Sequence, residues 1–271
     1  MSSSRLNALF ERCRSEDRSA VIGYLTAGDP NPELSRELLL TLAAQCDLLE
    51  IGMPFSDPMA DGPVIQAASE RALAAGTHID DVFALTRDVR AAHPELGIVL
   101  MGYANVPYAM GFEQFAERAQ AAGVDGVLLV DIPPEEGAIC DAVLRAHQLD
   151  RILLLSPTSP DARIALAGEH GSGFIYYVSL TGITGADMGD IAEIHDKVAH
   201  IQAATEMPVC VGFGIKTAAQ AAEVARFADG VVVGSHFVTT VAMADDPVAA
   251  LQEAAADIAT AVHQARGGDA G

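Results

Sequence analysis

Eight short apolar segments, each followed by sequence with helical periodicity, predict a closed parallel (β/α)8 barrel, the TIM-barrel fold. The segments are apolar on both faces, which is typical of strands in a parallel sheet that is covered by helices. A chain of 271 residues, 50% of them hydrophobic, can bury such a core. Because no linker or shift in composition divides the chain, we expect a single domain over residues 1–271, with a disordered tail at about 267–271.

The predicted strands end at glycine, proline or polar residues. They cover residues 20–26, 48–51, 98–101, 124–130, 151–155, 174–178, 209–211 and 230–233. The predicted helices have apolar residues spaced three and four apart. They cover residues 5–16, 32–45, 64–75, 80–92, 112–122, 135–147, 161–167, 190–204 and 217–227, with further helices to about 265.

Two of these helices carry additional expectations. The first, an extra helix before the barrel, has Leu6, Leu9, Phe10 and Cys13 on one face, so we expect it to cover one end of the core. The helix at 217–227 begins with Thr217 and Gln220 spaced as a capping box.

The chain is strongly acidic, with a formal net charge of −21. Such a surface repels phosphate backbones, so we expect no nucleic-acid partner. An anionic small molecule would need a local positive field, and the sequence has lysine only at Lys197 and Lys216. Salt adaptation and coding bias both remain open as explanations of the acidic composition.

Several features favour a cytoplasmic protein without a metal. No run of eighteen apolar residues predicts a membrane span, and the N-terminal residues lack an apolar signal core. The cysteines are scattered, which favours buried free thiols over disulfides or a zinc site. They are Cys13, Cys46, Cys140 and Cys210.

The loop after the second predicted strand carries three acids, Glu50, Asp57 and Asp61, and no basic residue. Glu50 ends an apolar strand, where burial raises the pKa of a carboxyl group toward values that suit proton transfer. Asp57 is equally well explained as a solvated loop residue. Loops after barrel strands form the active site in this fold, so Glu50 is the leading catalytic candidate.

Glycines after the seventh and eighth predicted strands indicate a phosphate site. Gly212 and Gly214 follow one strand, and Gly234 and Ser235 follow the next and open a helix. Backbone N–H groups and a helix N-terminus can bind an anion there even on an acidic protein. The alternative is that these glycines only form tight turns.

Neither lysine lies inside a predicted strand, which argues against a Schiff-base aldolase. The histidines fall in helices or in turns at helix ends, and His236 is interpreted as structural. Acid–base chemistry by carboxylates is the interpretation that remains.

Several segments, in order along the chain, closely resemble the tryptophan synthase alpha subunit family. The longest is LEIGMPFSDPMADGP at 49–63; the others are GDP at 28–30, YAN at 103–105, DIP at 131–133, GITGA at 182–186 and GFGI at 212–215. The resemblance implies reversible cleavage of indole-3-glycerol phosphate to indole and glyceraldehyde 3-phosphate, late in tryptophan biosynthesis. It also implies an α2β2 complex with a beta subunit, which alone would bind pyridoxal phosphate.

The resemblance assigns roles to individual residues of this chain. Glu50 would be the general acid and base, Asp61 would accept the indole N–H, and Tyr176 would orient the substrate or Glu50. Tyr177 should face the other way along the strand. The resemblance implies that the phosphate is bound by Gly185, Phe213, Gly214, Gly234 and Ser235. Thr184 would contact Asp61 when its loop closes. Pro54 and Asp57 would lie in the interface with the partner.

Two rival hypotheses remain. Another phosphate-binding barrel enzyme, acting on a related indole or as an isomerase, would be expected to place a lysine or a Cys/Asp pair at strand ends, and the sequence has none there. An inactive chain that only activates the beta subunit would have no need of Glu50 and Asp61.

Overall fold

The computed structural model describes residues 4–178, 191–212 and 214–266. Within these residues, eight parallel strands pair in sequence order and close on themselves as a barrel, with Val21 of the first strand opposite Val231 of the last. The strands are β1 (Ala20–Thr26), β2 (Leu48–Gly52), β3 (Gly97–Gly102), β4 (Gly126–Leu129), β5 (Asp150–Leu155), β6 (Ile175–Val178), β7 (Val209–Gly212) and β8 (Gly230–Val233). The predicted (β/α)8 barrel is confirmed.

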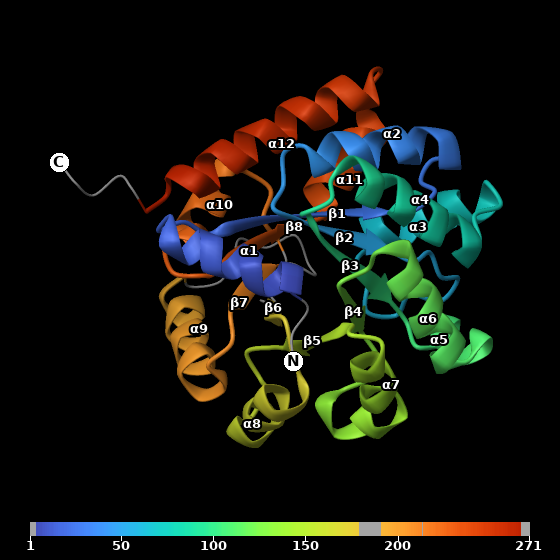
Figure 1. Ribbon diagram of the computed structural model, residues 1–271. Helices are drawn as coiled ribbons and strands as arrows, with labels where there is room; N and C mark the ends of the chain where they lie inside the picture. Colours follow the sequence, from blue (N-terminus) through green and yellow to red (C-terminus); the bar gives the residue numbers. More distant parts are fainter. Residues whose placement is uncertain (1–3, 179–190, 213, 267–271) are drawn as a thin grey trace.

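Helices surround the barrel (Figure 1). They are α1 (Ser4–Ser15), α2 (Pro32–Ala43), α3 (Pro63–Ala74), α4 (Ile79–Ala92), α5 (Asn105–Met110), α6 (Phe112–Ala122), α7 (Asp141–Ala146), α8 (Asp161–His170), α9 (Ile191–Thr205), α10 (Ala218–Ala225), α11 (Ser235–Met243) and α12 (Pro247–Gln264), with a 3-10 helix, η1, at Pro134–Ile139.

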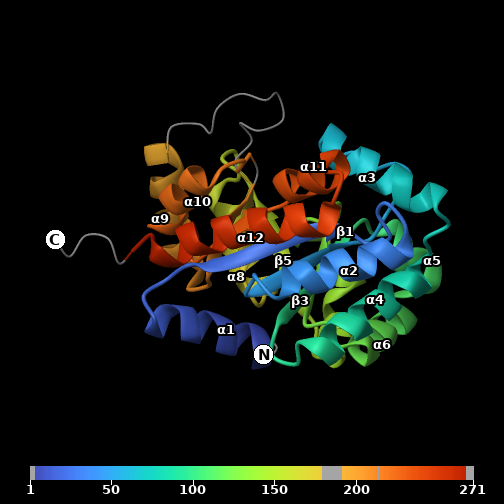
Figure 2. The same ribbon diagram turned by 90° about the horizontal axis from the view of Figure 1, so that it is seen from above.

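Helix α1 covers one end of the barrel, as its amphipathic sequence predicts. It lies at one end of the molecule, whereas α3 and α11 lie toward the other (Figure 2). Leu6 and Leu9 are fully buried and pack with inward-facing strand residues such as Ile22 and Leu48. The helix therefore completes the interior of the barrel, separately from the larger core between strands and outer helices.

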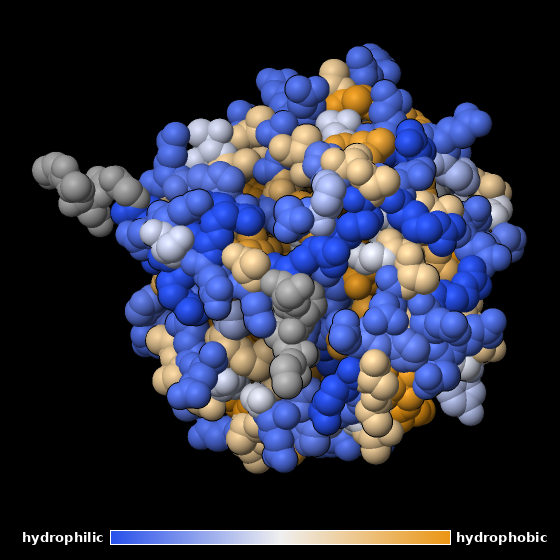
Figure 3. Space-filling model, in the orientation of Figure 1, coloured by the Kyte–Doolittle hydropathy of each residue, from blue (hydrophilic) through white to orange (hydrophobic). Residues whose placement is uncertain are grey.

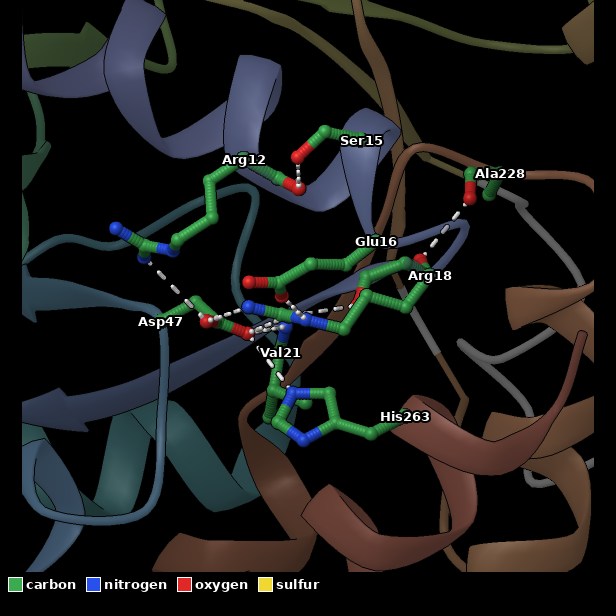
Figure 4. A network of polar contacts seen from close by, with 9 residues as sticks. Arg12, Ser15, Glu16, Arg18, Val21, Asp47, Ala228 and His263 are labelled. Atoms are coloured by element: carbon green, nitrogen blue, oxygen red, sulfur yellow. Dashed lines mark hydrogen bonds and ion pairs between the residues drawn. The ribbon is translucent and has the colours of Figure 1, made fainter. Parts of the chain in front are cut away.

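Asp47, at the start of β2, ties α1 to the C-terminal helix. Arg18 reaches its carboxylate at 2.8 Å, Arg12 at 3.7 Å and His263 of α12 at 3.0 Å (Figure 4). Although burial acts to raise the pKa of Asp47, hydrogen bonds from His263, Arg18 and the Val21 N–H hold it well below its usual range. On the face that carries α1, hydrophilic side chains predominate and apolar residues are scattered (Figure 3).

Two segments differ from the sequence-based expectation. The predicted helix at 135–147 is divided into η1 and α7; the segment contains Gly137, a poor helix former, and the Arg151–Asp141 ion pair occupies the space that a Cβ would fill there. Helix α5 was not predicted, since it has only 6 residues and contains Pro107.

The cap at the start of α10 is confirmed in its main part. Thr217 Oγ1 accepts the Gln220 N–H at 3.2 Å, as expected. The Gln220 side chain, however, accepts the N–H of Lys216 at 2.9 Å, one residue before the position that a capping box requires.

Candidate active site

A cavity of about 270 Å³ opens at the carboxyl ends of the strands, where active sites of this fold lie. Most of its lining is apolar, with two acids and one lysine among the lining residues. The lining residues are Tyr24, Glu50, Asp61, Gly62, Pro63, Val64, Ile65, Met101, Tyr176, Gly214, Ile215, Lys216, Val232, Gly234 and Ser235.

Glu50 is the most unusual of these side chains. It is 1% exposed, and neither carboxylate oxygen has a hydrogen-bond partner among the described residues. Burial raises its pKa from 4.5 to about 8, because a desolvated carboxylate is costly. Glu50 is therefore mostly protonated at neutral pH, as a proton donor requires, and the expected raised pKa is found.

Asp61 reaches the same cavity from the loop that precedes α3. The hydroxyl of Tyr103 donates to its carboxylate at 3.0 Å and accepts the N–H of Ala60 at 3.0 Å. The Gln66 side chain donates to the Asp61 carbonyl at 2.7 Å. Burial raises the pKa of Asp61, opposed by the hydrogen bond from Tyr103. The carboxylate is thus held in place with one oxygen free of this bond.

Tyr176 points into the barrel and Tyr177 points out. Tyr176 packs with the interior residues and lines the cavity, whereas Tyr177 packs in the core between strands and helices. Burial, followed by the nearby Glu50, raises the pKa of the Tyr176 phenol well above its usual value. Its hydroxyl lies so close to Gly212 that a Cβ there would collide with it. The predicted alternation is confirmed.

Two tyrosines of the site were not assigned from the sequence. Tyr103 directly follows β3 and so lies at the mouth of the barrel. Its place just after a predicted strand was the signal that could have marked it as a site residue. Tyr24 stands two residues after Ile22 and four after Ala20 on β1, and it lines the cavity; its hydroxyl lies 3.1 Å from Thr26 Oγ1 and against Gly52. The period-two pattern was the signal available for Tyr24.

The glycines after β7 and β8 lie on the cavity as expected. Gly214 has φ +83°, a left-handed conformation that favours glycine. Gly234 precedes α11 and Ser235 is its first residue, and both line the cavity. The first N–H groups of a helix have no partner within the helix and can bind an anion. Phe213, Thr184 and Gly185 lie outside the described residues.

Pro54 and Asp57 do not line this cavity. Asp57 is exposed and accepts a hydrogen bond from the Ser56 hydroxyl at 2.6 Å. Pro54 is partly buried beside a second hollow with Val106 and Met110 of α5. Neither residue is among those that line the cavity with Glu50 and Asp61, and their role in a partner interface stays a prediction.

The described residues include no cluster of histidine, cysteine and acidic side chains suited to a metal ion. All four cysteines are free thiols, and three of them are buried. His236 is half-buried beside Phe237, and burial lowers its pKa. Over the described ranges, no helix is long and apolar enough to span a membrane.

The sequence model of one protein family, the tryptophan synthase alpha chain, matches residues 10–266. The chain belongs to the tryptophan synthase alpha chain family. It is 48% identical over 256 residues to the tryptophan synthase alpha chain of Marinobacter nauticus, covering 94% of this chain and 95% of that one. It is 46% identical over 268 residues to that of Zymomonas mobilis, covering 97% and 98%.

Solved structures agree with this assignment to the tryptophan synthase alpha chain family. Tryptophan synthase subunit alpha from Legionella pneumophila superposes with a TM-score of 0.90 at 39% identity, covering 97% of this chain and 99% of that one. A chain of tryptophan synthase from M. tuberculosis, in an open form, gives 0.88 at 34% identity, covering 96% and 99%.

Proposed function

We propose that this chain catalyses the reversible cleavage of indole-3-glycerol phosphate to indole and glyceraldehyde 3-phosphate, in the last stage of tryptophan biosynthesis. The observation that carries the proposal is the buried carboxyl of Glu50, which has no hydrogen-bond partner among the described residues and shares one cavity with Asp61, Gly214 and Gly234. Membership of the tryptophan synthase alpha chain family supports the same reaction.

Glu50 is proposed to move both protons. Cleavage requires a proton on carbon 3 of the indole, and a group with a pKa of about 8 carries that proton at neutral pH. The resulting carboxylate then takes the proton of the glycerol hydroxyl as the carbon–carbon bond breaks and the aldehyde forms. Glu50 ends the cycle protonated, so the transfers balance.

Asp61 is proposed to accept the indole N–H. Protonation at carbon 3 gives the ring a positive charge, and a nearby carboxylate stabilises that charge through a charge-assisted hydrogen bond. The hydrogen bond from Tyr103 fixes the Asp61 carboxylate at the cavity wall before substrate binds. Burial raises the pKa of Asp61, and the hydrogen bond from Tyr103 acts in the opposite direction, toward the ionised form that would accept the indole N–H.

Tyr176 is proposed to orient the substrate or Glu50. Its side chain is buried inside the barrel, and after this burial the nearby Glu50 has the largest effect in raising the pKa of its phenol. A buried phenol with a strongly raised pKa stays protonated during turnover and acts as a hydrogen-bond donor. Tyr176 therefore orients rather than exchanges protons.

The substrate phosphate is proposed to bind at Gly214, Gly234 and Ser235, which share the cavity. Backbone N–H groups at glycines and at the N-terminus of α11 suit this anion. Gly185 and Phe213 are also proposed to bind the phosphate. Thr184 is proposed to contact Asp61 when its loop closes. The roles of these three residues are inferred from the sequence resemblance alone.

We propose a tryptophan synthase beta subunit as the partner, in an α2β2 tetramer, with Pro54 and Asp57 in the interface. M. tuberculosis tryptophan synthase, to which this chain is similar, supports that partner. Pyridoxal phosphate is proposed to bind only to the beta subunit, so this chain would carry no cofactor of its own.

We also propose that the chain forms a single domain and is cytoplasmic, in keeping with its composition.

The decisive experiment incubates the purified chain with indole-3-glycerol phosphate and follows indole release, alone and with the beta subunit. The proposed lyase activity is supported if the wild type releases indole in either condition and the Glu50→Gln variant does not. An inactive chain that only activates the beta subunit would stimulate that subunit yet release no indole in either condition. That result would reject the proposed reaction.

A further inference from the structure

Lys216 is the only basic side chain among the described residues that line the active-site cavity. It is exposed at the cavity wall beside Gly214 and Ile215, and no hydrogen bond or ion pair holds its ammonium within the described part of the chain. The chain has 37 acidic and 16 basic residues, so a free cation at the mouth of its cavity is unusual.

The backbone that carries Lys216 is fixed although its ammonium is free. Its N–H donates to the Gln220 side chain at 2.9 Å, and the N–H of Gln220 donates to Thr217 Oγ1 at 3.2 Å. The preceding residue, Ile215, is 3% exposed and anchors the segment in the core. The flexible part is therefore limited to the side chain, which needs no loop movement to turn toward the cavity.

Charge along the cavity is divided between two walls. Glu50 and Asp61 lie on the side of β2 and its loop, whereas Lys216 lies with Gly214, after β7. A phosphate dianion is repelled by the net charge of −21, and by the Asp61 carboxylate when that group is ionised. Backbone dipoles at Gly234 and Ser235 supply only partial charges, so a full cation beside them has an electrostatic reason to be there.

We propose that the Lys216 ammonium binds the substrate phosphate and determines the preference for a phosphorylated over an unphosphorylated substrate. The inference rests on the proposed lyase function and deepens it. In this proposal Lys216 provides a full positive charge for the phosphate, and the glycine N–H groups orient the phosphate through hydrogen bonds. Because this contact is the same in the ground and transition states, it lowers KM and leaves kcat nearly unchanged.

The test compares Lys216→Met, Lys216→Arg and the matched control Lys197→Met. Lys197 is the other lysine of the chain; it lies on α9, contacts the Ser159 carbonyl at 3.1 Å and does not line the cavity. Both methionine variants remove one positive charge, so a general effect of net charge would change them equally. Thermal unfolding checks that all three variants fold.

We expect Lys216→Met to raise KM for indole-3-glycerol phosphate by roughly tenfold with little change in kcat. In the reverse reaction, its preference for glyceraldehyde 3-phosphate over glyceraldehyde in condensation with indole should fall by the same factor. Lys216→Arg should retain most of the preference, and Lys197→Met should resemble the wild type. Added salt should raise KM of the wild type more than that of Lys216→Met.

An unchanged KM in Lys216→Met, or an equal loss on both aldehydes, would overturn the inference. The proposed function fails separately, if the wild type releases no indole. Calorimetric binding of inorganic phosphate to the wild type and to Lys216→Met still tests the lysine in that case. Tighter binding to the wild type supports the inference, and equal binding rejects it.

Discussion

The Tyr103 hydroxyl and the Asp61 carboxylate are joined by a hydrogen bond of 3.0 Å, although the two residues are 42 positions apart in the sequence. Tyr103 follows β3, whereas Asp61 belongs to the loop between β2 and α3. The same hydroxyl accepts the N–H of Ala60, so it holds both the backbone and the side chain of this loop. The position of Asp61 is therefore set by a neighbouring strand.

Tyr103→Phe is expected to lower kcat/KM for cleavage by about tenfold, which corresponds to roughly 1.4 kcal/mol for a hydrogen bond to a charged group. The physical reason is that Asp61 loses the contact that fixes its carboxylate and lowers its pKa. Steady-state kinetics provides the measurement. The control is Tyr108→Phe, since that tyrosine is 70% exposed. Equal activity of the two variants would contradict a positioning role.

Cleavage is expected to slow as the pH rises through about 8, where Glu50 loses its proton. Below that pH the carboxyl is available as the acid for carbon 3 of the indole. The measurement is the pH profile of kcat/KM for the wild type. A rate that rises through this range, with no descending limb, would show that Glu50 must start as the carboxylate.

Glu50→Gln is expected to stabilise the fold at pH 8 while abolishing cleavage. The folded-state pKa of Glu50 is raised from 4.5 to about 8, so stability is full below pH 4.5 and falls as the pH rises toward 8. Glutamine does not titrate, so the gain in unfolding free energy should grow over this window to on the order of 4 kcal/mol.

Urea unfolding of wild type and Glu50→Gln at pH 4.5 and 8 measures this gain. The two proteins should differ least at the lower pH. A difference that is independent of pH would mean that packing, and not the buried charge, separates the variants.

Arg71→Met is expected to destabilise the fold by about 2 kcal/mol, because it leaves a buried carboxylate unpaired. Arg71 of α3 binds both oxygens of Asp29 at 2.7 and 2.8 Å, and the Asp29 side chain is 5% exposed. The control is Arg36→Met, whose pair with Asp88 has both side chains about half exposed and should contribute less than about 1 kcal/mol. Comparable urea midpoints for both variants would refute the difference.

Leu9→Ala is expected to cost about 3 kcal/mol of unfolding free energy, since Leu9 is 1% exposed and packs inside the barrel. Leu73→Ala serves as the control, because Leu73 is 37% exposed on α3 and should cost less than about 1 kcal/mol. Thermal or urea unfolding distinguishes them. A small effect at Leu9 would mean that α1 is not an integral part of the core.

The sequence alone determined the alternation of strands and helices, the closed barrel and the helix that covers one end. Apolar spacing is a local property, so it can be recognised without knowing which segments meet. The family resemblance assigned Tyr176 to the site, strand alternation then placed Tyr177 on the opposite face, and a carboxyl at the end of an apolar strand marked Glu50. The roles of Pro54 and Asp57 stay predictions, and Thr184, Gly185 and Phe213 lie outside the described residues.

Only the tertiary structure decided which distant side chains meet. The hydrogen bond between Tyr103 and Asp61 and the place of Lys216 at the cavity both depend on how the strands register around the barrel. The contact of Arg151 of β5 with Gly137, in the divided helical segment, has the same origin. Such contacts join residues far apart in the chain, and barrel closure brings them together.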